Sequence, residues 1–206
     1  MMRIVKWLGW LAVVLLLLAS LLGLVGCKKQ YRFNSIDVTG ADWGKNLILL
    51  DLNREEVRLE DFKGKVTAVF FGFLSCPDAC PNTLNSLVKI KKNLGEKASE
   101  FQVFFVSIDP ERDSPENLRK FLLSFDEEFQ GLIAPIDYLN VLQKEFKLVV
   151  QKVFPDKMSE DKENSFYLID HTTHTYIFDK KSNLRLISPE STPLNELLLD
   201  IKFLIE

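Results

Sequence analysis

Two cysteines, Cys76 and Cys80, stand four positions apart where a strongly apolar segment gives way to a helical pattern. Backbone N–H groups and the helix dipole at such a helix start favour a thiolate. If the turn is helical, this spacing brings both sulfurs onto one face, where they can bind a soft metal ion or exchange a disulfide. A disulfide closing so short a loop would remove little entropy from the unfolded chain, so stabilisation is a weak reason for the pair.

The chain has only two histidines, His171 and His174, both near the end of an expected strand at 166–169. A site with two thiolates lacks a third ligand, and His171 follows Asp170 at a strand end that could face the cysteine loop. Two thiolates and one imidazole suit copper, because Cu(I) is soft and accepts three ligands and imidazole also serves Cu(II), whereas a closed zinc site needs a fourth ligand. In an extended strand His174 would point to the opposite face, so we expect a surface or packing role for it.

The composition excludes several classes of protein. The 206 residues include 47% hydrophobic and 27% charged residues, which is typical of a globular chain. The net charge of −3 argues against a nucleic-acid partner, since such proteins usually carry a basic excess. Three cysteines are too few for a disulfide scaffold and one short of a four-cysteine zinc or iron–sulfur site.

Cys76 and Cys80 should be preceded by a strand and followed by a helix, and the sequence pattern predicts both. Residues 66–73 form a near-continuous apolar run that indicates a strand buried on both faces. Apolar residues at near-helical spacing over 81–94 predict the helix. A second buried strand is expected at 101–108, followed by a helix at 115–125 that Ser114 can cap.

The rest of the chain continues this alternation of strands and helices. We expect a short helix, four strands and a terminal helix at 137–146, 148–154, 166–169, 175–178, 184–188 and 193–204. The last two of these strands are joined by a hairpin-like turn. The order predicts an α/β fold, a thioredoxin-like sheet with flanking helices and a β-hairpin insertion, preceded by an N-terminal membrane anchor.

The third cysteine, Cys27, belongs to the expected anchor. Arg3 and Lys6 precede an uncharged apolar segment at 7–25, and residues 24–27 resemble the lipobox of bacterial lipoproteins, whose cysteine receives a diacylglyceride. An uncleaved transmembrane helix is the alternative. Either way we expect a protein tethered to the cell membrane, with its folded part on the extracytoplasmic (periplasmic) face.

Three parts of the chain follow from these patterns. Residues 1–27 are the signal peptide with its lipobox, or the membrane anchor. Residues 28–45 form a tether with an edge strand. Residues 46–206 form the copper-binding domain of thioredoxin-like fold, which is long enough for one sizeable core.

Three segments resemble the SCO/SenC family of copper-binding assembly factors. The segments are residues 72–81, 107–115 and 167–172. The resemblance extends over about 59–206 and implies a thioredoxin-like fold and a membrane anchor. It also implies that Cys76, Cys80 and His171 are copper ligands, and it suggests that the acidic loop 109–113 lies near the metal site.

Two functions follow from these residues and this resemblance. The leading one is a copper metallochaperone for the dinuclear copper site of cytochrome c oxidase, acting on subunit II or another extracytoplasmic copper or thiol protein. Reduced Cys76 and Cys80 would hold Cu(I), with His171 completing the site. The alternative is a thiol–disulfide oxidoreductase without stable metal, in which Cys76 and Cys80 are the catalytic redox pair and Cys76 attacks. The sequence does not decide between the two, nor whether the protein is an enzyme.

Overall fold

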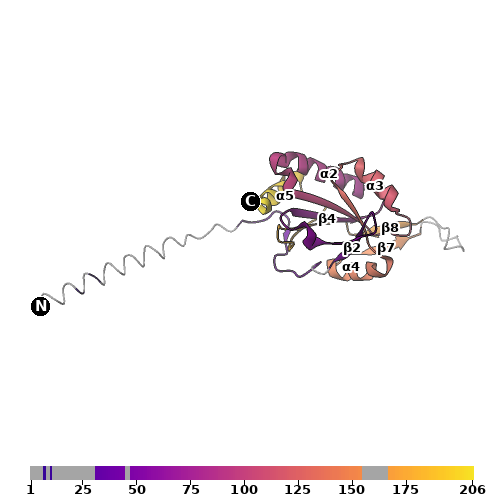
Figure 1. The fold of residues 1–206 in the computed structure, drawn as a ribbon, viewed down its shortest axis with the longest axis horizontal. Helices are drawn as coiled ribbons and strands as arrows, with labels where there is room; N and C mark the ends of the chain where they lie inside the picture. Colours follow the sequence, from indigo (N-terminus) through magenta and orange to yellow (C-terminus); the bar gives the residue numbers. More distant parts are fainter. Residues whose placement is uncertain (1–6, 8–9, 11–30, 45–46, 155–166) are drawn as a thin grey trace. The chain divides into compact units, whose positions relative to one another are not determined.

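The computed structural model in Figure 1 describes residues 7, 10, 31–44, 47–154 and 167–206. The chain forms two units, Met1–Arg32 and Phe33–Glu206, and the elements described below belong to the second. Apart from Trp7 and Trp10, the predicted anchor lies outside the described residues, and so does Cys27. Among the residues that are described, no helix has the length and apolar character needed to span a bilayer.

A mixed eight-stranded sheet lies at the centre of the second unit. Its strands are β1 (Ile36–Asp37), β2 (Ile48–Asp51), β3 (Glu56–Arg58), β4 (Val66–Gly72), β5 (Phe101–Ser107), β6 (Gln130–Ile133), β9 (Thr175–Phe178) and β10 (Leu184–Ser188). They are arranged in the order β1-β10-β9-β4-β5-β6-β2-β3. β4, β5 and β6 run parallel, and the other neighbouring pairs of this sheet are antiparallel.

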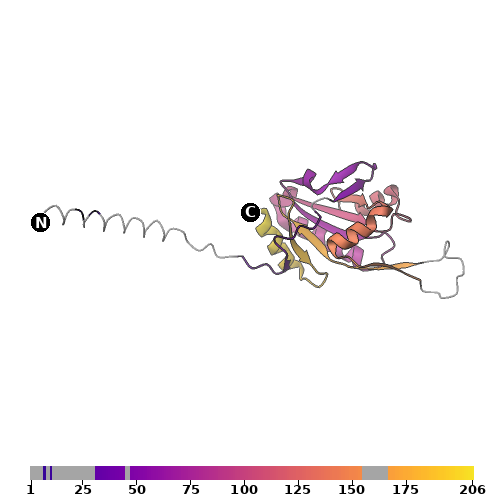
Figure 2. The ribbon, with the colours of Figure 1, turned by 90° about the horizontal axis from the view of Figure 1, so that it is seen from below.

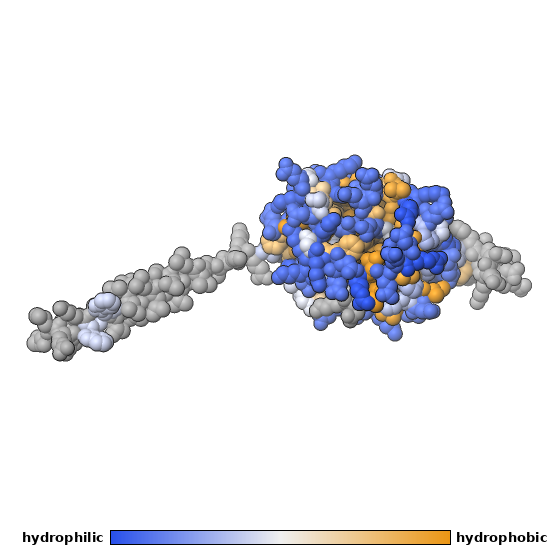
Figure 3. Space-filling model, viewed as in Figure 1, coloured by the Kyte–Doolittle hydropathy of each residue, from blue (hydrophilic) through white to orange (hydrophobic). Residues whose placement is uncertain are grey.

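Helices cover both faces of this sheet, as Figure 1 shows. One face carries α2 (Ala79–Leu94), α3 (Pro115–Leu123) and α5 (Leu194–Ile205), and the other carries α4 (Leu139–Phe146). Short 3-10 helices lie at Leu59–Phe62, Gly95–Glu100 and Ile136–Tyr138. Hydrophilic residues cover most of the surface in Figure 3, with smaller apolar areas between them, as expected for a surface in contact with water.

The two central strands, β4 and β5, are apolar almost throughout because both of their faces are buried. Every residue of β4 and β5 is buried. Because side chains alternate across a strand, Phe70 and Phe105 pack against α2, α3 and α5, whereas Phe71 and Phe104 pack on the face covered by α4. Burial on both faces therefore removes the polar alternation that an exposed strand would show.

A separate two-stranded antiparallel sheet consists of β7 (Val150–Val153) and β8 (Leu168–His171). In Figure 2 this hairpin is the narrow orange pair of strands that extends beyond the helices and the main sheet. Along β8, Ile169 is buried and the next residue, Asp170, is exposed. One face of the hairpin therefore packs on the body of the domain, and the other faces solvent.

The segment that enters the domain is fixed to α5 by a buried carboxylate. Asp200 is completely buried, and its oxygens accept hydrogen bonds from the backbone N–H groups of Asn34 (3.0 Å) and Ser35 (2.8 Å). The side-chain amide of Asn34 donates a further bond at 3.0 Å. The edge strand expected before residue 46 then follows as β1, which pairs with β10.

The predicted α/β thioredoxin-like sheet with flanking helices is confirmed. Each predicted strand and helix corresponds to an observed one, with ends that differ by a few residues. β2, β3 and β6 are not among the predicted strands. β3 and β6 are three and four residues long and contain charged residues or glycine, so they lack the run that indicates a strand. β2 does contain an apolar run, but at four residues it is shorter than most strands.

Candidate metal centre

Cys76 and Cys80 lie at the junction between β4 and α2. β4 ends at Gly72, and the chain turns so that the backbone N–H of Cys76 donates to the carbonyl of Phe73 at 3.2 Å. The backbone N–H of Cys80, in the first turn of α2, donates to the Sγ of Cys76 at 3.4 Å. This contact fixes the Cys76 sulfur beside the N-terminus of α2. Both cysteines are free thiols.

Gly72 gives the Cys80 sulfur its space. A Cβ at position 72 would lie 2.7 Å from the Sγ of Cys80 and 2.8 Å from the ring of Phe105. Both distances are shorter than real Cβ contacts, so a side chain there would displace the thiol or the ring. Gly72 was part of the sequence motif, and the structure gives the reason for glycine at this position.

His171 is the last residue of β8, and its ring lies against the cysteine loop. Its Nε2 is 3.9 Å from the Sγ of Cys80, and its Nδ1 is 3.0 Å from the carbonyl oxygen of Thr172. A carbonyl can only accept, so Nδ1 must carry the proton in this contact, and Nε2 then presents its lone pair to the sulfur. The ring also packs edge-on against Phe73, with centroids 5.6 Å apart. This tautomer is the one that can bind a metal ion through Nε2.

The two sulfurs and the imidazole nitrogen converge. One ligand atom from each of Cys76, Cys80 and His171 lies within 4.8 Å of the others, and this is the one such metal-compatible group in the described part of the chain. Cys76 is half-buried and Cys80 is completely buried. The donor set is soft and has three members, which fits Cu(I) better than a four-ligand zinc site.

Burial sets the protonation state of two of these groups. It raises the pKa of the Cys80 thiol above its ordinary value of 9.0 and lowers the pKa of His171 below its ordinary 6.5. Without a cation, Cys80 is therefore a neutral thiol and His171 a neutral imidazole near neutral pH. A bound metal ion would supply the positive charge that deprotonates the thiol.

A buried carboxylate supports the cysteine loop from the neighbouring strand. Asp113 is 3% exposed and accepts hydrogen bonds from the backbone N–H of Leu74 at 3.1 Å and from the hydroxyl of Ser107 at 2.7 Å. The sequence motif contained Asp113, but only as part of an acidic loop. The parallel pairing of β4 with β5 was the available signal, since it brings the loops after both strands to the same edge of the sheet.

His174 is not part of this group. β8 ends at His171 and β9 begins at Thr175, so His174 lies in the connection between the two strands. Of the two histidines, only His171 belongs to the metal-compatible group found among the described residues. The chain path after β8, rather than alternation along a strand, separates the two side chains.

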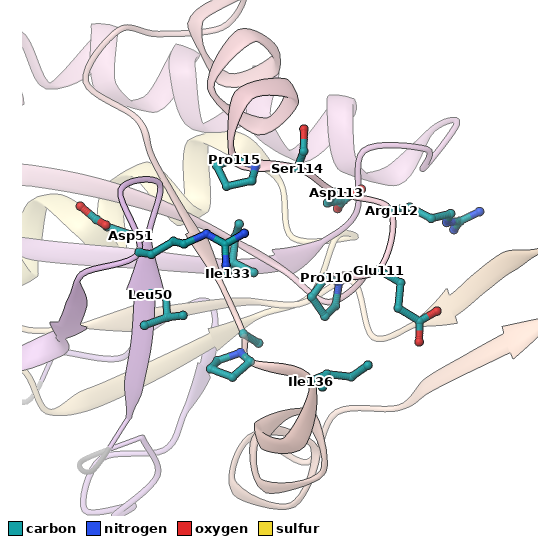
Figure 4. Close-up of a pocket in the computed structure, with 13 residues that line it drawn as sticks. Leu50, Asp51, Pro110, Glu111, Arg112, Asp113, Ser114, Pro115, Ile133 and Ile136 are labelled. Atoms are coloured by element: carbon teal, nitrogen blue, oxygen red, sulfur yellow. The ribbon is translucent and has the colours of Figure 1, made fainter.

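A surface hollow of about 450 Å³ borders the acidic loop on its other side. Figure 4 shows Asp113, Ser114 and Pro115 along one side of it and Leu50, Ile133 and Ile136 across from them. None of the described residues that line it is a cysteine or histidine. The hollow is therefore a neighbour of the metal centre and not part of it.

A protein-family model described as SCO1/SenC matches residues 38–206. One curated relative, a SCO2-like protein of Rickettsia felis, is 32% identical over 136 residues, which are 66% of this chain and 64% of that protein. This chain thus spans slightly less than two thirds of the relative's length.

Solved structures share the fold. The copper-bound ScoI of Bradyrhizobium japonicum is 30% identical with a TM-score of 0.64, and the match covers 76% of this chain and 95% of that one. Copper-bound yeast Sco1 is 28% identical with a TM-score of 0.62, over 75% of this chain and 86% of that one. The family model extends over far more than half of the sequence and includes the three converging residues. On this evidence the chain belongs to the SCO1/SenC family.

Proposed function

We propose that this protein is a copper metallochaperone that binds one copper ion through Cys76, Cys80 and His171. The observation that carries the proposal is the convergence of these three ligand atoms within 4.8 Å of one another. Thiolates select soft Cu(I), and imidazole extends the site to Cu(II). The copper-bound relatives with the same fold support the choice of metal.

The site is suited to transfer as well as binding. Cys76 is only half-buried, and three ligands leave room for an incoming thiolate from a partner. The copper can then move by stepwise ligand exchange, in which each new bond to the partner replaces one bond to this chain. The proposed recipient is the dinuclear copper site of cytochrome c oxidase, on subunit II, or another extracytoplasmic copper or thiol protein.

The proposed location follows from the sequence of the first 27 residues. Lipidation at Cys27, or an uncleaved helix, would hold the domain at the periplasmic face of the membrane. A tethered chaperone would meet a membrane-bound recipient at a raised local concentration.

Copper titration of the full-length protein in detergent, with and without reductant, tests the binding. We expect one equivalent of copper per reduced monomer, and loss of stoichiometric binding in Cys76→Ala and in Cys80→Ala. Cys27→Ala is the matched control, since it removes the third cysteine of the chain, which is not one of the proposed ligands. Tight stoichiometric binding that persists in either site variant would overturn the proposal.

A second candidate function is thiol–disulfide exchange, favoured by the contrast between a half-buried Cys76 and a completely buried Cys80. Cys76 would attack a partner disulfide as a thiolate and form a mixed disulfide, releasing one partner thiol. Cys80 would then displace the second partner thiol and close the Cys76–Cys80 disulfide. Two electrons and two protons pass from the pair to the partner, so the partner is reduced and this chain oxidised.

Trapping distinguishes this candidate from the first. Cys80→Ser should accumulate a mixed disulfide through Cys76 with a disulfide-containing substrate, whereas Cys76→Ser should not. If neither variant forms a mixed disulfide while the wild-type protein binds copper, exchange is excluded and the chaperone function stands.

A further inference from the structure

A cation–π contact joins the loop after β5 to the start of β8, although these two strands belong to different sheets. The guanidinium carbon of Arg112 lies 3.6 Å from the centre of the Tyr167 ring, and Arg112 Nη1 donates to the carbonyl oxygen of Tyr167 at 2.8 Å. Arg112 lies in the loop after β5, and Tyr167 immediately precedes β8. Such stacking is strongest where the cation has lost water, and Arg112 Nη2 is buried without a hydrogen-bond partner among the described residues.

Asp109 also connects Arg112 and Tyr167, because its carboxylate accepts a hydrogen bond from each of them. Its Oδ2 accepts from Arg112 Nε at 2.5 Å, and its Oδ1 accepts from the Tyr167 hydroxyl at 2.8 Å. Asp109 is 2% exposed, and its backbone N–H donates to the Ser107 hydroxyl at the end of β5. We call Asp109, Arg112 and Tyr167 the hairpin latch, because they fix the start of β8 to the main sheet.

The hairpin depends on contacts of this kind. β7 and β8 pair only with each other among the described strands. Side chains alternate along a strand, so Tyr167, Ile169 and His171 share one face. Ile169 is 7% exposed and packs in the core beneath the hairpin. The latch therefore lies at one end of this face and His171 at the other.

We infer that Arg112 is a positioning residue for the metal centre, because it closes the hairpin latch that keeps His171 within reach of Cys80. This inference rests on the proposed copper site for its functional meaning. Without the latch, Tyr167 loses the Arg112 guanidinium, and the buried Ile169 is left to hold β8 on the body of the domain. The end of β8 that carries the imidazole Nε2 is then free to move away from the cysteine loop.

Lys152 is a weaker partner of the same ring. Its Nζ lies 4.5 Å from the centre of the Tyr167 ring and pairs with Glu111 at 2.5 Å. Both side chains are close to half exposed, at 41% and 48%, so solvent screens this pair. The Arg112 side chain is 27% exposed and its partner carboxylate 1%, which makes Arg112 the member to substitute.

Arg112→Met tests the inference, because methionine retains much of the apolar stem and loses the guanidinium. Arg119→Met is the matched control, since Arg119 is an arginine of nearby α3 whose side chain contacts Asn53 and not the hairpin. Three quantities are measured on the full-length wild type and on each variant. They are copper affinity, nitrogen hyperfine coupling in the Cu(II) electron paramagnetic resonance spectrum, and metal-free NMR contacts between the His171 and Phe73 rings.

We expect Arg112→Met to lower copper affinity by roughly 10- to 100-fold, the range for residues that orient a ligand. It should also weaken the imidazole nitrogen coupling and the His171–Phe73 contacts, while Arg119→Met matches the wild type. Copper affinity and ring contacts that stay within twofold of the wild type would overturn the inference. If Arg112→Met does not fold, Tyr167→Leu replaces it, because that variant removes the ring and hydroxyl but leaves Arg112 paired with Asp109.

The positioning role of Arg112 and the copper-binding function can fail independently of each other. If the wild-type protein binds no copper, the metallochaperone proposal fails, and the metal-free ring contacts still decide whether the latch positions His171. If the wild type binds copper and Arg112→Met retains both binding and ring contacts, only the positioning role fails.

Discussion

The Nε2 of His171 lies 3.9 Å from the Sγ of Cys80, although 91 positions separate the two residues in the sequence. The cysteine belongs to the first turn of α2 and the histidine to the end of a hairpin outside the main sheet. Their contact is therefore a product of the whole domain. Changes near either residue, or in the elements that hold them, should reach the metal centre.

His171→Ala should separate metal binding from disulfide chemistry. We expect copper affinity to fall by at least roughly 100-fold, since loss of an outer partner alone costs roughly 10- to 100-fold. The rate of disulfide exchange through Cys76 should change much less, because both sulfurs remain. His174→Ala is the control, and it should leave copper affinity unchanged. Equal losses in the two histidine variants would contradict the ligand assignment.

Gly72→Ala should damage both stability and the metal centre. The added methyl group would lie 2.7 Å from the Cys80 sulfur, and overpacking of this kind costs roughly 1–3 kcal/mol in free energy of unfolding. Copper affinity should fall as well, because the thiol must shift.

Gly131→Ala provides the matched comparison for the Gly72 variant. Its new methyl group would meet Leu118 and Leu122 at 2.9–3.0 Å, whereas the methyl group at position 72 would meet the Cys80 sulfur. It should lower the melting temperature and leave copper binding intact. If both alanine variants bind copper like the wild type, Gly72 is needed for packing alone.

Asp113 should make stability depend on pH in an unusual direction. Burial raises its pKa from an ordinary 3.8 to about 6. Because the folded protein holds this proton more tightly than the unfolded chain, the stabilisation is present below about pH 4 and is lost as the pH rises to about 6. At about 1.4 kcal/mol per pKa unit, the loss approaches 3 kcal/mol.

Chemical denaturation of Asp113→Asn across pH 4 to 7 measures this contribution. We expect the wild type to lose stability relative to the variant as the pH rises, since asparagine does not titrate. The variant also alters the hydrogen bonds to Leu74 and Ser107. This change in free energy of unfolding does not vary with pH, so it cancels when the pH dependence of the two proteins is compared. The exposed Asp137→Asn serves as the control. A wild type that instead gained stability relative to Asp113→Asn over this range would contradict the assignment.

Asp200→Asn should loosen the segment that enters the domain. The amide keeps one acceptor oxygen, but its NH2 group replaces the other and cannot accept from Asn34 or Ser35, and a buried N–H left unpaired in this way costs roughly 1–3 kcal/mol. Limited proteolysis should cut near residues 33–37 sooner than in the wild type. Copper affinity should be unchanged, and Glu196→Gln on the same helix should behave like the wild type. Unaltered cleavage would show that β1 pairing with β10 holds the segment by itself.

The sequence was sufficient to predict the central strands and the three residues whose side chains converge. β4 and β5 are buried on both faces, so their composition alone marks them as strands. Cys76 and Cys80 were recognisable because a strand end and a helix start flank them. His171 was predicted because two thiolates need a third ligand and only two histidines were available.

The supporting contacts could not be predicted in the same way. The bonds of Asp113 to the cysteine loop depend on β4 lying beside β5 in register, with Gly72 opposite Ser107. The stacking of Arg112 on Tyr167 depends on where the hairpin packs. His174 shows the same limit, because its direction follows from where β8 ends and not from its spacing to His171. These relationships arise from tertiary packing, which local patterns do not encode.

The antiparallel pairing of β4 with β9 also determines when the metal centre can form. It aligns Phe70 with Thr175, more than a hundred residues later, and long-range pairings of this kind are slow steps in folding. During synthesis the cysteines emerge well before the strand and hairpin that complete their site. A partly made or partly folded chain therefore exposes two thiols without the histidine beside them. The three-ligand site exists only in molecules in which β9 has paired with β4 and β8 has packed on the domain.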